Sequence, residues 1–258
     1  MTNILVADFV LVLLIFLRII SAMVASPVFS NKALPVIPKI FISFVIAYIV
    51  FLSVDTAQVK FDITVWSLFF FAVKEIITGL IIGFMMNFVF YGISFAGHII
   101  GFDMGLTIAD VFNPMEETNN NVVGEVIYIS ALLVFFLING HHYLIRGLAY
   151  SFSVVQLGKF SINASVYDLL VKYSASIFII AVKISSPILV SFFLVHLGEA
   201  VIARVMPQVQ IFFVTQPLKI GIGFLLIMIA VPFCIYVIKI LLKDYENNLF
   251  TLVKAMGS

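Results

Sequence analysis

Hydrophobic residues occur along this chain in long, nearly continuous runs, and each run is bounded by a short polar or proline-containing segment. Apolar runs of about 18 residues or more are typical of helices that cross a lipid bilayer. We therefore predict an all-α integral membrane protein, folded as a single membrane domain over residues 1–258. Its six predicted spans are Ile4–Ala25, Ile40–Val54, Ile63–Ile100, Val126–Leu157, Tyr173–Ala203 and Ile220–Leu242.

The third apolar run is too long for one simple crossing. As a single helix, Ile63–Ile100 would extend about 57 Å at 1.5 Å per residue, whereas the hydrocarbon core is about 30 Å thick. The run is therefore either one helix that projects well beyond the bilayer or a broken pair buried in protein, because irregular backbone is not tolerated in contact with lipid. The pattern alone leaves both alternatives open.

The connections between spans are predicted from their prolines and charges. We expect turns or linkers at Pro27–Lys39, Gly158–Lys172 and Arg204–Lys219, and a modest amphipathic tail after Leu242. The first and third of these resemble each other weakly in the motifs PKIFISF and LKIGIGF, which would suit two hairpin units of related build.

A polar, glycine-rich segment, Gly97–Gly124, interrupts the apolar pattern in the middle of the chain. It carries four acidic residues, and no Lys or Arg occurs between Glu75 and Ile145. Because Pro114 disfavours helical backbone before it, we predict a central polar loop between membrane segments. The loop also holds apolar residues, so it either lies in solvent as an ordinary surface loop or folds back into a cavity lined by the spans.

Charged residues also lie in or beside the apolar runs. A charge that faces lipid costs at least about 2.5 kcal/mol, so each should face protein, water or the interface. One interpretation is that the lysines extend to the interface and that the last two charges mark helix ends. The other is that these side chains form polar contacts between subunits. The residues concerned are Arg18, Lys74, Glu75, Glu199 and Arg204.

Glycines at four-residue spacing predict where helices approach closely. Gly79 and Gly83 form one GxxxG motif, and Gly97, Gly101 and Gly105 form two overlapping ones. This spacing places bare backbone on one helix face, which favours close packing against another helix. The third apolar run is thus expected to pack on protein.

Composition and motifs exclude several classes of function. The chain is 63% hydrophobic and only 10% charged, and its net charge of +1 gives no basic surface for nucleic acid. A single cysteine, Cys234, excludes an intrachain disulfide and a multi-cysteine metal site. The adjacent His141 and His142 lack the spacing of a zinc protease, and no phosphate-binding glycine loop is present. We expect neither an enzyme nor a cofactor.

Four segments resemble the FliR family of flagellar export-gate proteins and its injectisome relatives. Together they cover nearly the whole chain in the order found in that family, and MPQVQIFFVTQPLKI is the most specific part. The chain differs in its Asn-rich ETNNNV after Pro114. The segments are LRIISAMVASPVFSNKALP, GFDMGLTIADVFNP, NGHHYLI and EAVIARVMPQVQIFFVTQPLKIGIGF.

The resemblance implies a core subunit of the type III protein export gate, in the bacterial inner membrane within a flagellar basal body or injectisome base. Such subunits are bent helical hairpins that join FliP-type and FliQ-type subunits in a helical hetero-oligomer, and work with FlhB-type and FlhA-type export components on unfolded protein substrates. Much of their apolar surface packs on these partners. The overall resemblance favours a flagellum over an injectisome.

The resemblance also implies that the loop after the long third run reaches into the pore as a plug. A deformable apolar seal would suit Phe112 and Met115, because methionine repacks easily around varied side chains. Two other functions remain open from the residues alone, a secondary transporter with a coupling site among the intramembrane charges and a purely structural scaffold. The predicted plug residues are Asp110, Val111, Phe112, Asn113, Pro114, Met115, Glu116 and Glu117.

Overall fold

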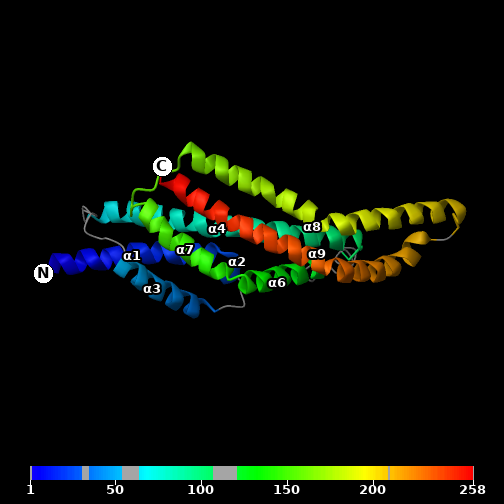
Figure 1. Cartoon of the computed structure of the whole chain (residues 1–258), viewed down its shortest axis with the longest axis horizontal. Coiled ribbons are helices and arrows are strands. Elements are labelled where there is room, and N and C mark those ends of the chain that lie inside the picture. The colour runs from blue at the N-terminus through cyan, green and yellow to red at the C-terminus, as the bar shows by residue number, and fades with distance from the viewer. Residues whose placement is uncertain (1, 31–34, 54–63, 107–120, 209, 258) are drawn as a thin grey trace. The chain divides into compact units, whose positions relative to one another are not determined.

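The computed structural model describes residues 2–30, 35–53, 64–106, 121–208 and 210–257 of the chain. All regular secondary structure within these ranges is helical (Figure 1), which confirms the predicted all-α class. The helices are α1 (Thr2–Ala25), α2 (Pro27–Ser30), α3 (Val36–Ser53), α4 (Val65–Asp103), α6 (Val122–Leu137), α7 (Gly140–Val154), α8 (Ala164–Val205) and α9 (Ile211–Met256).

The long apolar helices confirm an integral membrane protein with about six hydrophobic segments. By length and composition, α1, α3, α4, α8 and α9 could each cross a membrane, and a sixth span results if the bent pair α6 and α7 is counted as one. The third apolar run is one unbroken helix, α4. The fourth predicted span, Val126–Leu157, is instead broken at Asn139, whose φ of 59° lies in the left-handed region and cannot continue a helix.

Two predicted connections are shorter than the sequence indicated. α8 begins at Ala164, inside the expected linker, because the Asn163 Oδ1 accepts a hydrogen bond from Val166 N (2.8 Å) and so caps the helix. α9 begins at Ile211 and continues through Pro217 and beyond Leu242 into the predicted tail. A proline removes one backbone hydrogen bond but does not end a helix that is held by other contacts.

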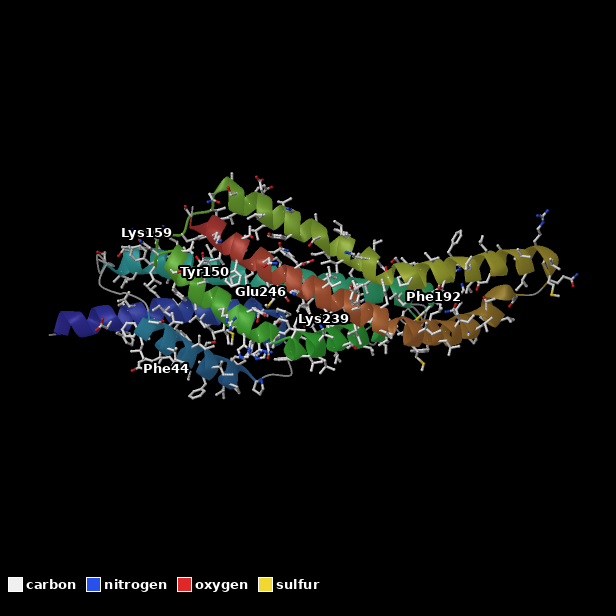
Figure 2. The ribbon with its side chains drawn as sticks, viewed as in Figure 1. Phe44, Tyr150, Lys159, Phe192, Lys239 and Glu246 are labelled. Carbon is white, nitrogen blue, oxygen red and sulfur yellow. The ribbon has the colours of Figure 1, made fainter. Side chains whose placement is uncertain are left out.

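The chain divides into two compact units. Unit 1 consists of Met1–Phe88, Asn139–Ser174 and Lys243–Ser258, and unit 2 of Val89–Ile138 and Ala175–Leu242. In unit 1, α1 packs along α3, where Phe16 meets Phe44 edge to face at 6.2 Å (Figures 1 and 2). The glycines of α4 in this unit face α1, since a Cβ at Gly79 or Gly83 would overlap the backbone of α1.

Unit 2 has an aromatic core. Phe90 is fully buried and packs edge to face on Tyr128 and Phe135 of α6, with both ring centroids at 5.8 Å. Phe192 of α8, labelled in Figure 2, is also fully buried. In contrast, the stretches of α8 and α9 toward their shared turn expose large apolar side chains. Such a surface requires lipid or protein to cover it.

Candidate functional site

Both described ends of the central polar segment are helical in the structure. Gly97–Asp103 forms the last turns of α4, and Val122–Gly124 forms the first turn of α6, because apolar packing and helix caps extend both helices into the segment. All eight predicted plug residues, Asp110 to Glu117, lie outside the described residues. The site is therefore built from the described residues that flank them.

The carboxyl end of α4 is fixed by a glycine cap. Gly105 has a φ of 76°, a left-handed conformation that other residues rarely adopt. Gly105 N donates to Phe102 O at 2.9 Å, and Leu106 N donates to Gly101 O at 3.0 Å. This pair of bonds is the Schellman arrangement, which satisfies carbonyl groups that a helix end would otherwise leave free.

Gln216 of α9 binds the same helix end. Its Nε2 donates to Gly105 O at 2.9 Å and to Met104 O at 3.3 Å. A Cβ at position 105 would overlap the Gln216 amide, and a Cβ at Gly223 would press on the side chain of Met104. Gly105, predicted as a packing residue, thus allows both the helix cap and the approach of α9.

Asn121 fixes the beginning of α6. Its Oδ1 accepts hydrogen bonds from Val123 N (3.0 Å) and Gly124 N (3.3 Å), which is the usual role of asparagine as a helix N-cap. Its Nδ2 donates in the other direction, to Gly97 O (3.1 Å) and His98 O (3.3 Å) of α4. Sequence reasoning missed this residue, although an asparagine directly before an apolar run is a recognised helix-start signal.

The glycines of α4 make room for this contact. A Cβ at Gly97 would overlap Gly124, and a Cβ at Gly101 would overlap the Asn121 side chain. The end of α4 and the start of α6 are therefore held side by side. The described residues on both sides of positions 107–120 form one packed base.

A second polar site lies inside unit 1, where Arg18 of α1 pairs with Glu75 of α4. Both side chains are fully buried, and Arg18 donates to the Glu75 carboxylate from Nε (2.5 Å) and Nη2 (3.0 Å). Arg18 also donates to the carbonyl oxygens of Ser151 (3.1 Å) and Val155 (3.2 Å), at the end of α7. The guanidinium lies over the ring of Phe152, 4.2 Å from its centroid. The cation thus neutralises Glu75 and stabilises the carboxyl end of α7.

Lys74 and Glu75 together hold the connection between α7 and α8. Glu75 Oε1 accepts a hydrogen bond from Gly158 N (2.8 Å), and Lys74 Nζ donates to Gly158 O (3.2 Å). Gly158 has a φ of 75° and lies against Phe71, so a side chain would be strained here. Neighbouring residues of α4 thus bind both polar groups of one backbone residue.

These contacts change the interpretation of the intramembrane charges. Arg18 and Glu75 are partners of each other within the chain, because both are fully buried and bonded inside unit 1. Their predicted contacts with another subunit stay a prediction. Lys74 also has a partner in the chain. A transporter coupling site at this pair is not favoured, since its hydrogen-bonding groups are engaged by protein. Arg204 is exposed at the end of α8, where its predicted role stays a prediction.

Glu199 of α8 has partners in unit 2. Its Oε2 lies 2.8 Å from Lys219 Nζ of α9 and 3.2 Å from His196 Nδ1. Lys219 Nζ also lies 3.4 Å from His196 Nδ1. The cluster joins the two long helices in the part of the chain where their surfaces are otherwise apolar.

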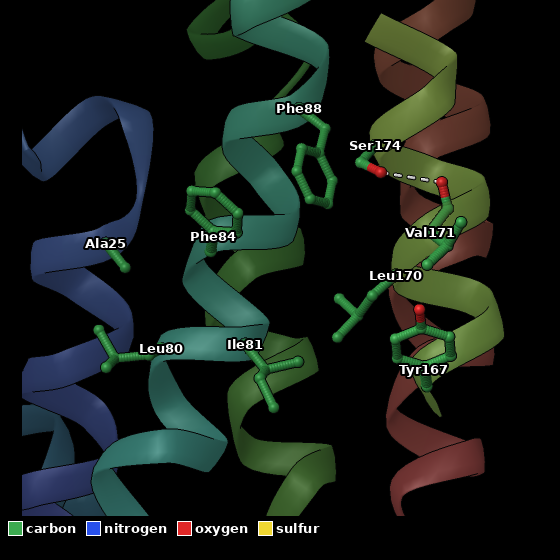
Figure 3. A pocket seen from close by; sticks show the side chains of 9 residues that line it. All are labelled: Ala25, Leu80, Ile81, Phe84, Phe88, Tyr167, Leu170, Val171 and Ser174. Carbon is green, nitrogen blue, oxygen red and sulfur yellow. Dashed lines mark hydrogen bonds between the residues drawn. The ribbon is translucent and has the colours of Figure 1, made fainter. Parts of the chain in front are cut away.

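Unit 1 also holds an open pocket of about 680 Å³ between α4 and α8 (Figure 3). Figure 3 shows Phe88 of α4 and Leu170 of α8 pointing into the space between the two helices, and Phe84 and Tyr167 also line the pocket. The hydroxyl of Ser174 already donates to Val171 O at 2.8 Å. The lining is almost entirely apolar, and among the described residues no group of three or more His, Cys, Asp or Glu side chains could hold a metal.

The long apolar helices, the internally paired charges and the packed base around positions 107–120 define a helical integral membrane protein built for contact with lipid or other helices. Comparison with known proteins gives the family. The chain belongs to the bacterial export proteins, family 1, whose family model matches residues 9–245.

Named relatives agree with this assignment. The chain is 32% identical to flagellar biosynthetic protein FliR of Bacillus subtilis, over 88% of each protein, and 29% identical to FliR of Escherichia coli, over 84% of each. It is 26% identical to Yop proteins translocation protein T of Yersinia pestis, over 67% of each. The resemblance inferred from the sequence motifs is thus confirmed.

Proposed function

We propose that this chain is a core subunit of the type III protein export gate in the bacterial inner membrane. The observation that carries the proposal is the family match over residues 9–245, with relatives named for flagellar biosynthesis and for Yop protein translocation. Both kinds of relative belong to protein export, so the common function is passage of protein across the membrane. The chain is 32% identical to a flagellar relative and 26% identical to the Yop translocation protein, which favours a flagellar system.

The chain acts in an assembly with FliP-type and FliQ-type subunits, served by FlhB-type and FlhA-type components. Its exposed apolar surface supports this. On α8 and α9, Phe193 is 60% exposed, Phe213 70% and Ile229 78%. Neighbouring helices or lipid would cover these side chains, since patches of this kind mark interaction sites.

The segment Asp110–Glu117 seals the resting pore of this gate. Its composition supports the role, because Phe112 and Met115 supply apolar, adaptable surface. The packed base supports it further, since Gly105, Gln216 and Asn121 fix the described residues on both sides of the segment. Because the segment is anchored at both ends, an unfolded polypeptide could displace it from the pore, and the segment could close the pore again afterwards.

Deletion of Phe112–Glu117 tests this proposal. The assembled gate carrying the deletion should show a higher resting conductance to small ions in planar bilayers, because the apolar barrier is shortened. The control is Ile162→Ser, which changes an exposed apolar residue far along the chain, 66% exposed, and should leave conductance unchanged. Unchanged conductance in an assembled gate with the deletion would contradict the sealing role and indicate that the chain is a structural scaffold.

A further inference from the structure

We propose that Glu199 is a positioning residue that, through Lys219, sets the orientation of α9 next to Pro217, and through Gln216 and Gly223 of α9 the position of the carboxyl end of α4. The inference rests on the proposed function, because the carboxyl end of α4 leads toward the proposed seal. It goes beyond that function by assigning control of this helix end to an ion cluster on α8 and α9.

Glu199 makes both of its contacts through one carboxylate oxygen. Its Oε2 lies 2.8 Å from Lys219 Nζ and 3.2 Å from His196 Nδ1. The side chains of Glu199 and Lys219 are only 18% and 14% exposed, so their attraction is less screened than that of a surface pair.

Lys219 lies next to a proline in α9, since Pro217 precedes it by two residues and directly follows Gln216. Proline lacks an amide hydrogen and therefore weakens the helix at this point. The Glu199–Lys219 pair thus holds α9 to α8 beside its weakened turn.

A neighbouring face of α9 contacts the carboxyl end of α4. Gln216 lies about 60° around the helix from Lys219, and Gly223 lies two turns further on the face of Gln216. Gln216 binds the carbonyl groups of Met104 and Gly105, and Gly223 receives the Met104 side chain. One face of α9 thus binds α8, and the adjacent face holds the end of α4. A rotation of α9 at this point would withdraw both contacts together.

Charges on α4 reinforce the link. Asp103, the last residue of α4, interacts electrostatically with His196 and Lys219. The charged and titratable groups in contact with Glu199 are Lys219 on α9 and His196 on α8. Loss of Lys219 would remove the cation that joins the Glu199 carboxylate to α9.

The test measures the α4 to α9 contact directly. In a Cys234→Ser background, Met104→Cys and Gly223→Cys place two thiols at a contact where a disulfide can form. In the assembled gate, Lys219→Met should slow disulfide formation about fivefold, the effect of losing one partly exposed charge-assisted hydrogen bond. Lys219→Arg should restore the rate, because it keeps the cation. Lys239→Met, an exposed lysine of the same helix (Figure 2), should leave it unchanged.

Resting conductance separates this inference from the proposed function. If Lys219→Met slows the disulfide and raises conductance, and Lys219→Arg reverses both, the positioning role stands. If the Phe112–Glu117 deletion leaks but Lys219→Met changes neither measurement, the positioning role is wrong while the seal stands. If Lys219→Met slows the disulfide but the deletion does not leak, the positioning role stands and the seal is wrong. Should Lys219→Met not assemble, Glu199→Gln, which keeps the side-chain shape, takes its place with the same expected results.

Discussion

At the residue scale, Arg18 and Glu75 show how a membrane helix accommodates two charges. Burying an ion pair costs desolvation energy, which is recovered only if the remaining hydrogen-bonding groups are satisfied. Arg18 meets this condition through Glu75, Ser151 and Val155, and Glu75 through Arg18 and the amide of Gly158. The pair therefore ties α1, α4 and the end of α7 into one arrangement.

Removing one member of the pair should be far more damaging than removing both. Arg18→Met or Glu75→Gln alone is expected to lower the free energy of unfolding by about 3–5 kcal/mol, because it leaves an uncompensated buried group. The double variant Arg18→Met/Glu75→Gln should lose clearly less than the sum of the two single losses. Unfolding of the detergent-purified protein measures all three, with exposed Arg204→Met as control at about 0.5 kcal/mol or less. Additive losses in the double variant would contradict a direct coupling.

The sequence indicated that charges inside apolar runs need partners, but it did not indicate which partners. Arg18 and Glu75 are 57 positions apart, and their pairing depends on how α1 packs on α4. Asn121 was a visible helix-start signal, yet its second role, donating to the backbone of α4, depends on Gly97 and Gly101 lying opposite. Local signals can be read from sequence, whereas contacts between distant helices require the fold.

At the element scale, α4 is the helix on which both polar sites depend. Its first half holds Gly79 and Gly83 against α1 in unit 1, and its second half holds Gly97 and Gly101 against the start of α6 in unit 2. The spacing of these glycines was readable from the sequence, and so was the excessive length of the run. The start of α9 could not be read from the sequence, because its Pro217 indicated a turn at a point where the structure continues the helix.

Adding one methyl group to α4 tests this packing. A Cβ at Gly83 would lie 2.9 Å from the Cβ of Ala25, so Gly83→Ala should force α1 and α4 apart. We expect a loss of about 1–3 kcal/mol in the free energy of unfolding, as for other overpacked sites. The matched control is Gly198→Ala on α8, where a Cβ would meet nothing within 4 Å. Alanine there should be neutral or stabilising by up to about 1 kcal/mol, its advantage over glycine in a helix. Equal effects of the two changes would contradict close packing at Gly83.

At the scale of the whole molecule, apolar surface dominates. The chain is 63% hydrophobic, and many large apolar side chains of α3, α8 and α9 are exposed when the chain is considered alone. Composition predicted the membrane class and the number of long segments, because both depend on run length. The division into two units was not predictable, since α4, α8 and α9 each contribute to both without a break in their apolar pattern.

The central claim is that the segment Asp110–Glu117 lies in the path of an exported polypeptide. A photo-crosslinking residue at Met115, in an assembled gate that holds an export substrate stalled in transit, tests it most directly. The control carries the same crosslinker at Ser165, an exposed position in the first turn of α8. We predict a crosslink to substrate from Met115 and none from Ser165. No crosslink from Met115, with the substrate demonstrably stalled, would contradict the claim and leave the chain as a scaffold of the export gate.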